Sequence, residues 1–285
     1  MPTKRRIVYF SALKINSMKK LFALIWLGGL LYSCANNPYA SSNRSYKKQA
    51  KAYARQLSQY PLKDSMVGIS PSWVGTTNFS LRRPNFVIIH HTAQNSCAET
   101  LKTFTLKRTQ VSAHYVICKD GTVHHMLNDY YRAWQAGISK WGNTTDINSS
   151  SIGIELDNNG FEPFPEPQIN SLITLLHNLK TAYTIPDGNF IGHGDIAPGR
   201  KVDPNIYFPW KQLADSGYGK WFDDTTGIQT PENFDYLLAL RVVGYDMKDT
   251  TAVIRAFKRH WMQDSTFLIT DADKKAIYQL QKKFR

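Results

Sequence analysis

The stretch Phe86-Val87-Ile88-Ile89-His90-His91 decides the fold of this 285-residue chain. Its first four residues are apolar and of strand-forming type, an uninterrupted pattern that is typical of a strand buried on both faces. The run then ends in two imidazoles. The stretch therefore predicts a buried strand with polar side chains at its carboxyl end.

Further strand patterns follow along the chain. Segments 113–117 and 122–126 flank an Asp120-Gly121 turn, which predicts a hairpin. In the segment 151–156, Ile and Leu alternate with Ser, Gly and Glu, so a further strand directs the Glu155 carboxylate away from its aliphatic side chains. A last strand is predicted over 189–191.

Apolar residues at helical spacing complete the predicted fold. They indicate a helix over 98–108, a long helix over 169–179, and a run of helical segments after Trp221. The fold class is therefore α/β, a mixed β-sheet flanked by helices, followed by a small C-terminal three-helix domain. The predicted divisions are 1–34, 35–62, 63–226 and 232–285.

The N-terminal segment has the pattern of a signal peptide. Met18-Lys19-Lys20 precedes an apolar run over 21–32 that is short for a membrane span, and the run ends in Leu31-Tyr32-Ser33-Cys34. This ending resembles the lipobox of bacterial lipoproteins, in which the cysteine becomes the lipidated first residue. The alternative is a plain signal peptide with a chance cysteine. Residues 1–17 precede a better start at Met18, and residues 46–60 predict a short amphipathic helix after a polar tether.

Charge and cysteine content leave several alternatives open. A net charge of +13 favours polyanions in general, but no nucleic-acid-binding motif accompanies it, so we expect no nucleic-acid partner. A soluble basic surface explains the charge equally well. Cys97 and Cys118 are either a disulfide pair in an oxidising compartment or free buried thiols.

Three residues have the types and order of a catalytic metal site. His90 ends the buried strand, His193 lies in Gly192-His193-Gly194-Asp195, and Asp203 follows ten residues later. Two imidazoles and one carboxylate would leave a fourth position of a zinc ion open, as catalytic zinc requires. The alternative is a set of hydrogen-bonded structural histidines.

Four motifs then identify a family. They are Ile89-His90-His91-Thr92-Ala93, Ser112-Ala113-His114-Tyr115, Ser151-Ile152-Gly153-Ile154-Glu155-Leu156, and the run from His193 to Pro204. In this order they resemble the type 2 N-acetylmuramoyl-L-alanine amidase family over about residues 80–222, a family related in fold to peptidoglycan-recognition proteins. The resemblance implies a mixed sheet flanked by helices, with Zn2+ in a surface groove.

The resemblance also assigns roles to individual residues. It implies that His90, His193 and Asp203 are the zinc ligands, that Glu155 is the acid/base residue, and that Lys201 stabilises the transition state. Zinc would lower the pKa of a bound water to about 7 and polarise the scissile carbonyl. The alternative for Glu155 is a buried ion pair, for example with Lys201.

Other residues are candidates for the substrate groove. Trp134, Gly137, Trp141 and Arg200 would supply stacking faces and a donor for peptide carboxylates, and His91 is a candidate substrate contact. Each of these residues could equally pack in the core or on the surface without contacting a substrate. The family usually reads Trp-His-Ala-Gly where this chain has Gln135, which leaves the role of that position open. His114, His124 and His125 are interpreted as substrate-lining or structural residues.

The segment from about Phe234 to Phe284 resembles the three-helix peptidoglycan-binding domain often joined to these amidases. Its Asp271-Ala272-Asp273-Lys274 turn is close to the usual motif but not identical. The competing interpretation is a structural cap on the catalytic domain.

Together these features predict a zinc-dependent amidase that cleaves the bond between N-acetylmuramic acid and L-alanine in peptidoglycan. The alternatives are a non-catalytic peptidoglycan-recognition lipoprotein and a basic polyanion-binding lipoprotein. We expect a monomer that is lipid-anchored through Cys34 in the cell envelope, at the periplasmic side of the outer membrane, although the residues after Cys34 do not themselves select a membrane.

Overall fold

The computed structural model describes residues 37–59, 75–81 and 83–284. The chain divides into two compact units, Met1–Thr76 and Thr77–Arg285. In the first unit, helix α2 (Ala40–Leu57) has no buried residue and starts earlier than the predicted helix over 46–60. Cys34 and the predicted signal peptide lie outside the described residues. Among the described helices, none combines the length and the apolar composition needed to cross a membrane.

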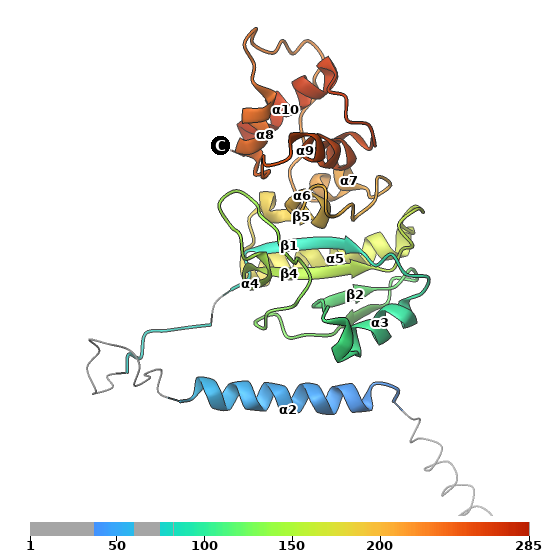
Figure 1. Cartoon of the computed structure of the whole chain (residues 1–285), viewed down its shortest axis with the longest axis vertical. Coiled ribbons are helices and arrows are strands. Elements are labelled where there is room, and N and C mark those ends of the chain that lie inside the picture. Colours follow the sequence, from blue (N-terminus) through green and yellow to red (C-terminus); the bar gives the residue numbers. More distant parts are fainter. Residues whose placement is uncertain (1–36, 60–74, 82, 285) are drawn as a thin grey trace, which may run out of the picture. The chain divides into compact units, whose positions relative to one another are not determined.

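Five strands of the described second unit form one sheet in the order β3-β2-β4-β1-β5 (Figure 1). They are β1 (Phe86–His91), β2 (Tyr115–Ile117), β3 (Val123–His125), β4 (Ser151–Leu156) and β5 (Phe190–Gly192). Strand β1 pairs in parallel with β4 and β5, β4 pairs in parallel with β2, and β2 and β3 form an antiparallel hairpin. The predicted mixed sheet and the hairpin at Asp120-Gly121 are therefore confirmed.

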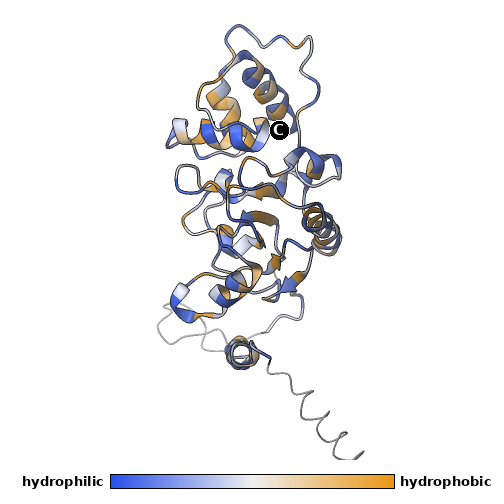
Figure 2. Cartoon of the chain, turned by 90° about the vertical axis from the view of Figure 1, so that its right-hand side faces the viewer, coloured by the Kyte–Doolittle hydropathy of each residue, from blue (hydrophilic) through white to orange (hydrophobic). Residues whose placement is uncertain are grey.

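Strand β1 lies inside the sheet and its two faces enter different cores. Val87 and Ile89 pack with the apolar face of α5 (Glu166–Tyr183). Phe86 and Ile88 point the other way, into a core that they share with the C-terminal helices. Because neither face reaches water, the strand carries an unbroken apolar run instead of alternation. Figure 2 shows the apolar residues concentrated along the strands of the sheet.

Short helices surround the sheet, and several begin at a side chain that caps them. Ser96 accepts a hydrogen bond from the Glu99 amide at the start of the helix Cys97–Thr105, and Asp235, Asp249 and Thr270 cap the helices that begin at Tyr236, Thr250 and Asp271. The helices not yet given are α3 (Cys97–Thr105), η1 (Lys107–Thr109), α4 (Ile147–Ser150), η2 (Asp187–Asn189), α6 (His193–Ile196), α7 (Trp210–Asp215), α8 (Tyr236–Val243), α9 (Thr250–Phe257), the π-helical turn η3 (Lys258–Met262) and α10 (Asp271–Lys283).

The C-terminal helices bury their apolar faces against the sheet as well as against one another. Leu240 of α8, Val253 of α9 and Ile277 of α10 are fully buried in the same core as Ile88 of β1. Figure 1 shows these helices gathered on the β5 side of the sheet. Their apolar contacts therefore continue into those of the sheet without a polar boundary.

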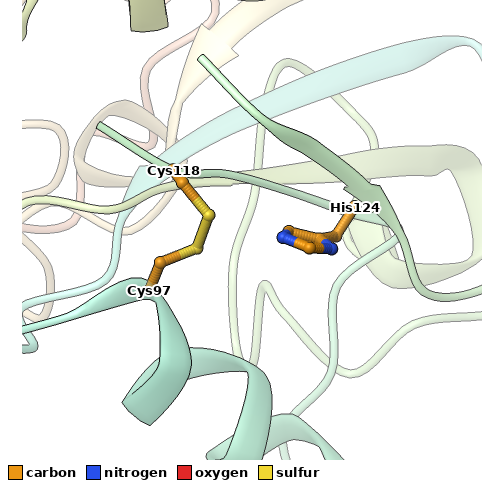
Figure 3. A group of neighbouring side chains, drawn as sticks. All are labelled: Cys97, Cys118 and His124. Atoms are coloured by element: carbon orange, nitrogen blue, oxygen red, sulfur yellow. A yellow bond between two sulfur atoms is a disulfide. The ribbon is translucent and has the colours of Figure 1, made fainter. Parts of the chain in front are cut away.

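A disulfide joins Cys97 at the start of α3 to Cys118, which follows β2 (Figure 3). The sequence left this pairing open, and the structure brings the two Cα atoms to 5.3 Å. His124 of β3 lies beside the disulfide (Figure 3). The bond fixes α3, whose inner face buries only Thr100 and Leu101, to the end of β2.

Replacing Cys97 and Cys118 together with Ala should lower the stability of the protein. The bond closes a loop over a sequence separation of 21, so its loss is expected to cost about 3 kcal/mol and to lower Tm by roughly 6–12 °C. Thermal unfolding followed by circular dichroism measures this change. A matching Tm fall in the wild-type protein under reducing conditions is the control, and an unchanged Tm in both would contradict a stabilising bond.

Candidate active site

Three side chains converge where β1 and β5 end. His90 is the fifth residue of β1, His193 follows β5 directly as the first residue of α6, and Asp203 lies in the loop that comes after α6. The Asp203 Oδ2 atom is 3.0 Å from His90 Nδ1 and 2.9 Å from His193 Nδ1. All three residues are buried. The structure thus brings together the residues predicted as metal ligands, at the edge where the carboxyl ends of parallel strands meet.

The outer nitrogen of each histidine is held by an oxygen of one loop. His90 Nε2 lies 2.5 Å from Gln135 Oε1, and His193 Nε2 lies 3.1 Å from the main-chain oxygen of Ala136. Both oxygens can accept a hydrogen bond from Nε2 of a ring. The Nδ1 atom of each ring is then left facing Asp203.

The orientation of the Gln135 amide follows from a chain of hydrogen bonds. The Ser151 hydroxyl donates to the Ile147 carbonyl at 2.7 Å, so its oxygen accepts from the Gln135 Nε2 group, also at 2.7 Å. The Gln135 oxygen must therefore face His90. This role was not predicted from the sequence, in which position 135 departs from the usual family residue.

The electrostatics of the three converging groups favour a cation between them. Burial and the neighbouring His90 lower the pKa of His193 to about 4, so this ring is neutral at pH 7. Although burial alone would raise it, the two adjacent histidines hold the pKa of Asp203 well below its usual range. A neutral imidazole and a carboxylate are the protonation states that bind a divalent metal. Two imidazole nitrogens and one carboxylate oxygen within 4.8 Å of one another fit zinc.

Glu155 lies beside this group on the neighbouring strand. It pairs in register with His90, and its Oε1 atom is 4.0 Å from His90 Nδ1. Burial raises the pKa of Glu155 to about 7, opposed by the charges of His90 and Lys201. Lys201 is thus close enough to act electrostatically on the Glu155 carboxyl. This proximity agrees both with the predicted role of Lys201 in the transition state and with the alternative of an ion pair.

The remaining predicted contacts fall into two groups, exposed and buried. The Trp134 side chain is 54% exposed next to Gln135 and can offer its ring to a ligand. Trp141 is buried in the core, where its ring contacts Tyr245 at 5.0 Å. The predicted stacking role of Trp141 is therefore wrong, because neither face of its ring is open to a sugar.

His91 and Arg200 make structural hydrogen bonds. The buried His91 ring accepts the main-chain N–H of Asn205 at 3.1 Å, and burial lowers its pKa. The Arg200 guanidinium donates to the carbonyls of Ala136 and Ile138, which holds the loop that contacts both metal-ligand candidates. These bonds give both side chains a role in supporting the site, while the expected substrate contacts of His91 and Arg200 stay predictions.

The other histidines near the motifs also have local partners. His114 accepts the Gly153 amide at its Nδ1 atom and donates through Nε2 to the Tyr131 carbonyl, so it joins the edge of β2 to β4. The His125 ring stacks on Tyr115 at 4.4 Å. Neither ring lies among the converging metal-ligand candidates.

Comparison with known proteins gives the family. A family described as N-acetylmuramoyl-L-alanine amidase matches residues 80–206. N-acetylmuramoyl-L-alanine amidase AmiD of Escherichia coli is 35% identical over 226 residues, covering 68% of this chain and 81% of AmiD. 1,6-anhydro-N-acetylmuramyl-L-alanine amidase AmpD of Haemophilus influenzae is 37% identical over 108 residues, 38% of this chain and 59% of AmpD.

Solved structures of amidases are also similar to this chain. A complex of Escherichia coli AmiD with anhydro-N-acetylmuramic acid-L-Ala-D-gamma-Glu-L-Lys has a TM-score of 0.65 at 32% identity, covering 73% of this chain and 93% of that chain. AMPDH3 of Pseudomonas aeruginosa with anhydromuramic pentapeptide has a TM-score of 0.66 at 29% identity, covering 77% and 99%.

The fold and these similarities define an amidase, a hydrolytic enzyme. In particular, the chain belongs to the type 2 N-acetylmuramoyl-L-alanine amidase family, as its four sequence motifs predicted.

Gly153 of β4 leaves the space that Gln135 occupies. A methyl group at this position would lie 2.7 Å from Gln135 Cγ. We expect Gly153→Ala to lower the free energy of unfolding by about 1–3 kcal/mol through overpacking. The cost should shrink by about 1 kcal/mol or more when Gln135 is also Ala, because neighbouring substitutions couple. Urea unfolding of the two single variants and the double variant measures this coupling, and strictly additive losses would contradict the contact.

Proposed function

We propose that this protein is a zinc-dependent N-acetylmuramoyl-L-alanine amidase that hydrolyses the bond between N-acetylmuramic acid and the L-alanine of the peptidoglycan stem peptide. One observation carries the proposal. Two imidazole nitrogens face a single carboxylate oxygen of Asp203 at 2.9–3.0 Å, while Gln135 and the Ala136 carbonyl hold the second nitrogen of each ring. Histidines that bind a metal ion are usually held in this way, by an oxygen at the nitrogen that does not face the ion.

The chain's own residues supply the proton transfer and part of the charge stabilisation. Bound zinc would polarise the scissile carbonyl and acidify a water molecule. The Glu155 carboxyl, on the strand next to His90, is placed to take a proton from the attacking water and to pass it to the leaving L-alanine nitrogen. Lys201, whose charge reaches Glu155, can stabilise the carbonyl oxygen as it becomes negative.

Exposed apolar side chains around the site support an amphiphilic substrate. Trp134 precedes Gln135, Ile138 presents its carbonyl to Arg200, and Val202 precedes the Asp203 ligand candidate. All three side chains are exposed. Such surfaces suit the faces of a sugar ring and a short peptide. The muropeptide ligands in the AmiD and AMPDH3 structures are of this chemical class.

The direct experiment is mass spectrometry of purified muropeptides incubated with the purified full chain, with and without a zinc chelator. Release of a free stem peptide that starts at L-alanine, abolished by the chelator and restored by zinc, is the expected result. Binding without release, with zinc present, would move the protein to a non-catalytic recognition role. Release that is insensitive to the chelator would overturn the zinc assignment alone.

Two substitutions separate the proton carrier from the metal ligands. Glu155→Ala should retain zinc and lower kcat by roughly 10²–10⁴-fold, the usual contribution of a general acid/base. Asp203→Ala should lose zinc, because it removes the only anionic ligand candidate in the described cluster. Metal content by mass spectrometry, measured beside turnover, distinguishes the two effects. Full activity of Glu155→Ala would show that another group carries the proton.

We further propose that the protein is a monomer anchored by a lipid at Cys34 in the cell envelope, at the periplasmic side of the outer membrane. The support is the signal-peptide pattern and the Leu31-Tyr32-Ser33-Cys34 ending. A tethered hydrolase with a net charge of +13 would also be attracted to anionic surfaces and wall polymers.

The Cys34→Ala variant should be released from the membrane fraction while keeping its catalytic activity. In the wild-type protein, mass spectrometry of the N-terminal peptide should show a cysteine that carries acyl chains. Separation of the inner and outer membranes then tests the expected membrane. An unmodified Cys34, or a peptide that starts at another residue, would contradict the lipid anchor.

A further inference from the structure

The carboxylate of Asp195 connects the catalytic centre to the C-terminal helices. Asp195 lies on α6, two residues after His193, and is 3% exposed. Its Oδ1 atom accepts a hydrogen bond from the Tyr245 hydroxyl at 2.8 Å, and its Oδ2 atom lies 2.6 Å from His260 Nδ1. Oδ2 also accepts the Gly192 amide at 3.0 Å. A buried carboxylate beside a metal-ligand candidate is thus bonded by two side chains from the C-terminal segment.

The His260 ring is itself held tightly. It lies between two indoles, with ring centroids 3.9 Å from Trp210 and 4.2 Å from Trp261, and is nearly parallel to both. The Trp261 indole N–H donates to the Tyr245 hydroxyl at 3.3 Å. His260 and Trp261 are consecutive residues of the π-helical turn η3, a wide turn of a kind that often occurs at functional sites.

A second residue of this turn lies behind the ligand segments. Arg259 packs so close to Gly194 that a methyl group there would collide with its guanidinium. Arg259 and His260 line a small cavity together with Asp203. The Gly194 amide donates to the Asp203 carbonyl at 2.7 Å, so the segments that carry His193 and Asp203 are bonded to each other here.

Helix α6 depends on such contacts because of its length. It has four residues, all of them buried. A helix this short gains too few internal hydrogen bonds to stabilise itself. The direction of the His193 ring therefore depends on what fixes α6 from outside, and the side-chain bonds of Asp195 are the part of that support that comes from the C-terminal helices.

We propose that Tyr245 and His260 are positioning residues of the amidase, which act through Asp195 to hold His193 in the orientation that binds the metal. The C-terminal helices then form one side of the catalytic centre and are not a separate peptidoglycan-binding module. This inference rests on the proposed zinc site. It accounts for a buried polar network that peptidoglycan binding by the helices would not require.

The test measures zinc affinity of the full chain by competition with a chromophoric chelator. His260→Leu should weaken zinc binding by up to about tenfold, because it acts on His193 through Asp195 and even the loss of a direct outer partner of a ligand costs about 10–100-fold. Tyr245→Phe should weaken it by a smaller factor of roughly three, since it removes one hydroxyl and keeps the ring. Excess zinc should restore most of the activity of both variants.

Two controls separate positioning from general damage. His260→Asn keeps an N–H donor near the Nδ1 position and should bind zinc nearly as the wild-type protein does. Tyr278→Phe makes the same chemical change as Tyr245→Phe in α10, where the ring contacts Phe234, and should leave affinity unchanged. A visible absorption spectrum with Co2+ in place of zinc should shift only in His260→Leu and Tyr245→Phe, because it reports the ligand geometry.

The outcomes are distinguishable. Wild-type affinity and an unshifted Co2+ spectrum in folded Tyr245→Phe and His260→Leu would overturn the positioning role and leave the proposed zinc site intact. Failure of the wild-type protein to bind zinc would overturn the proposed function and this inference with it. If His260→Leu does not fold, Tyr245→Phe decides by the same measurements.

Discussion

The burial of β1 on both faces is the constraint on which the rest of the structure depends. One face packs on α5 and the other on the C-terminal helices, so the strand cannot shift by one residue without turning apolar side chains into the wrong core. That register fixes His90 on the same side as Ile88. It also sets His90 opposite Glu155 on β4, where the alternation of that strand directs the carboxylate to the site.

The candidate catalytic centre lies at the carboxyl ends of these strands, and single hydrogen bonds orient its side chains. His90 gains its orientation from Gln135, His193 from the Ala136 carbonyl, and the loop that carries both oxygens from Arg200. Each bond is ordinary in strength. Together they direct two nitrogens at one carboxylate, which is the degree of organisation that the proposed metal site requires.

The C-terminal helices contribute to the same organisation. Their apolar residues complete the core under β1, and His260 extends from them to the carboxylate of Asp195. The sequence left two interpretations open for this segment, a peptidoglycan-binding module and a structural cap. The buried network favours the second, because its polar groups are directed at α6 and not at solvent.

The sequence by itself determined the family, the mixed sheet, and the residues that converge as metal-ligand candidates, because strand periodicity and motif order are local properties of the chain. It did not reveal that Gln135 supports His90, nor that Trp141 is packed in the core. The disulfide between Cys97 and Cys118 and the link from Asp195 to His260 were also beyond it. These contacts join residues from 21 to 65 positions apart, or depend on which side of a ring is covered. Only the tertiary structure decides them, since nothing in a local pattern specifies which distant groups meet when two cores form around one strand.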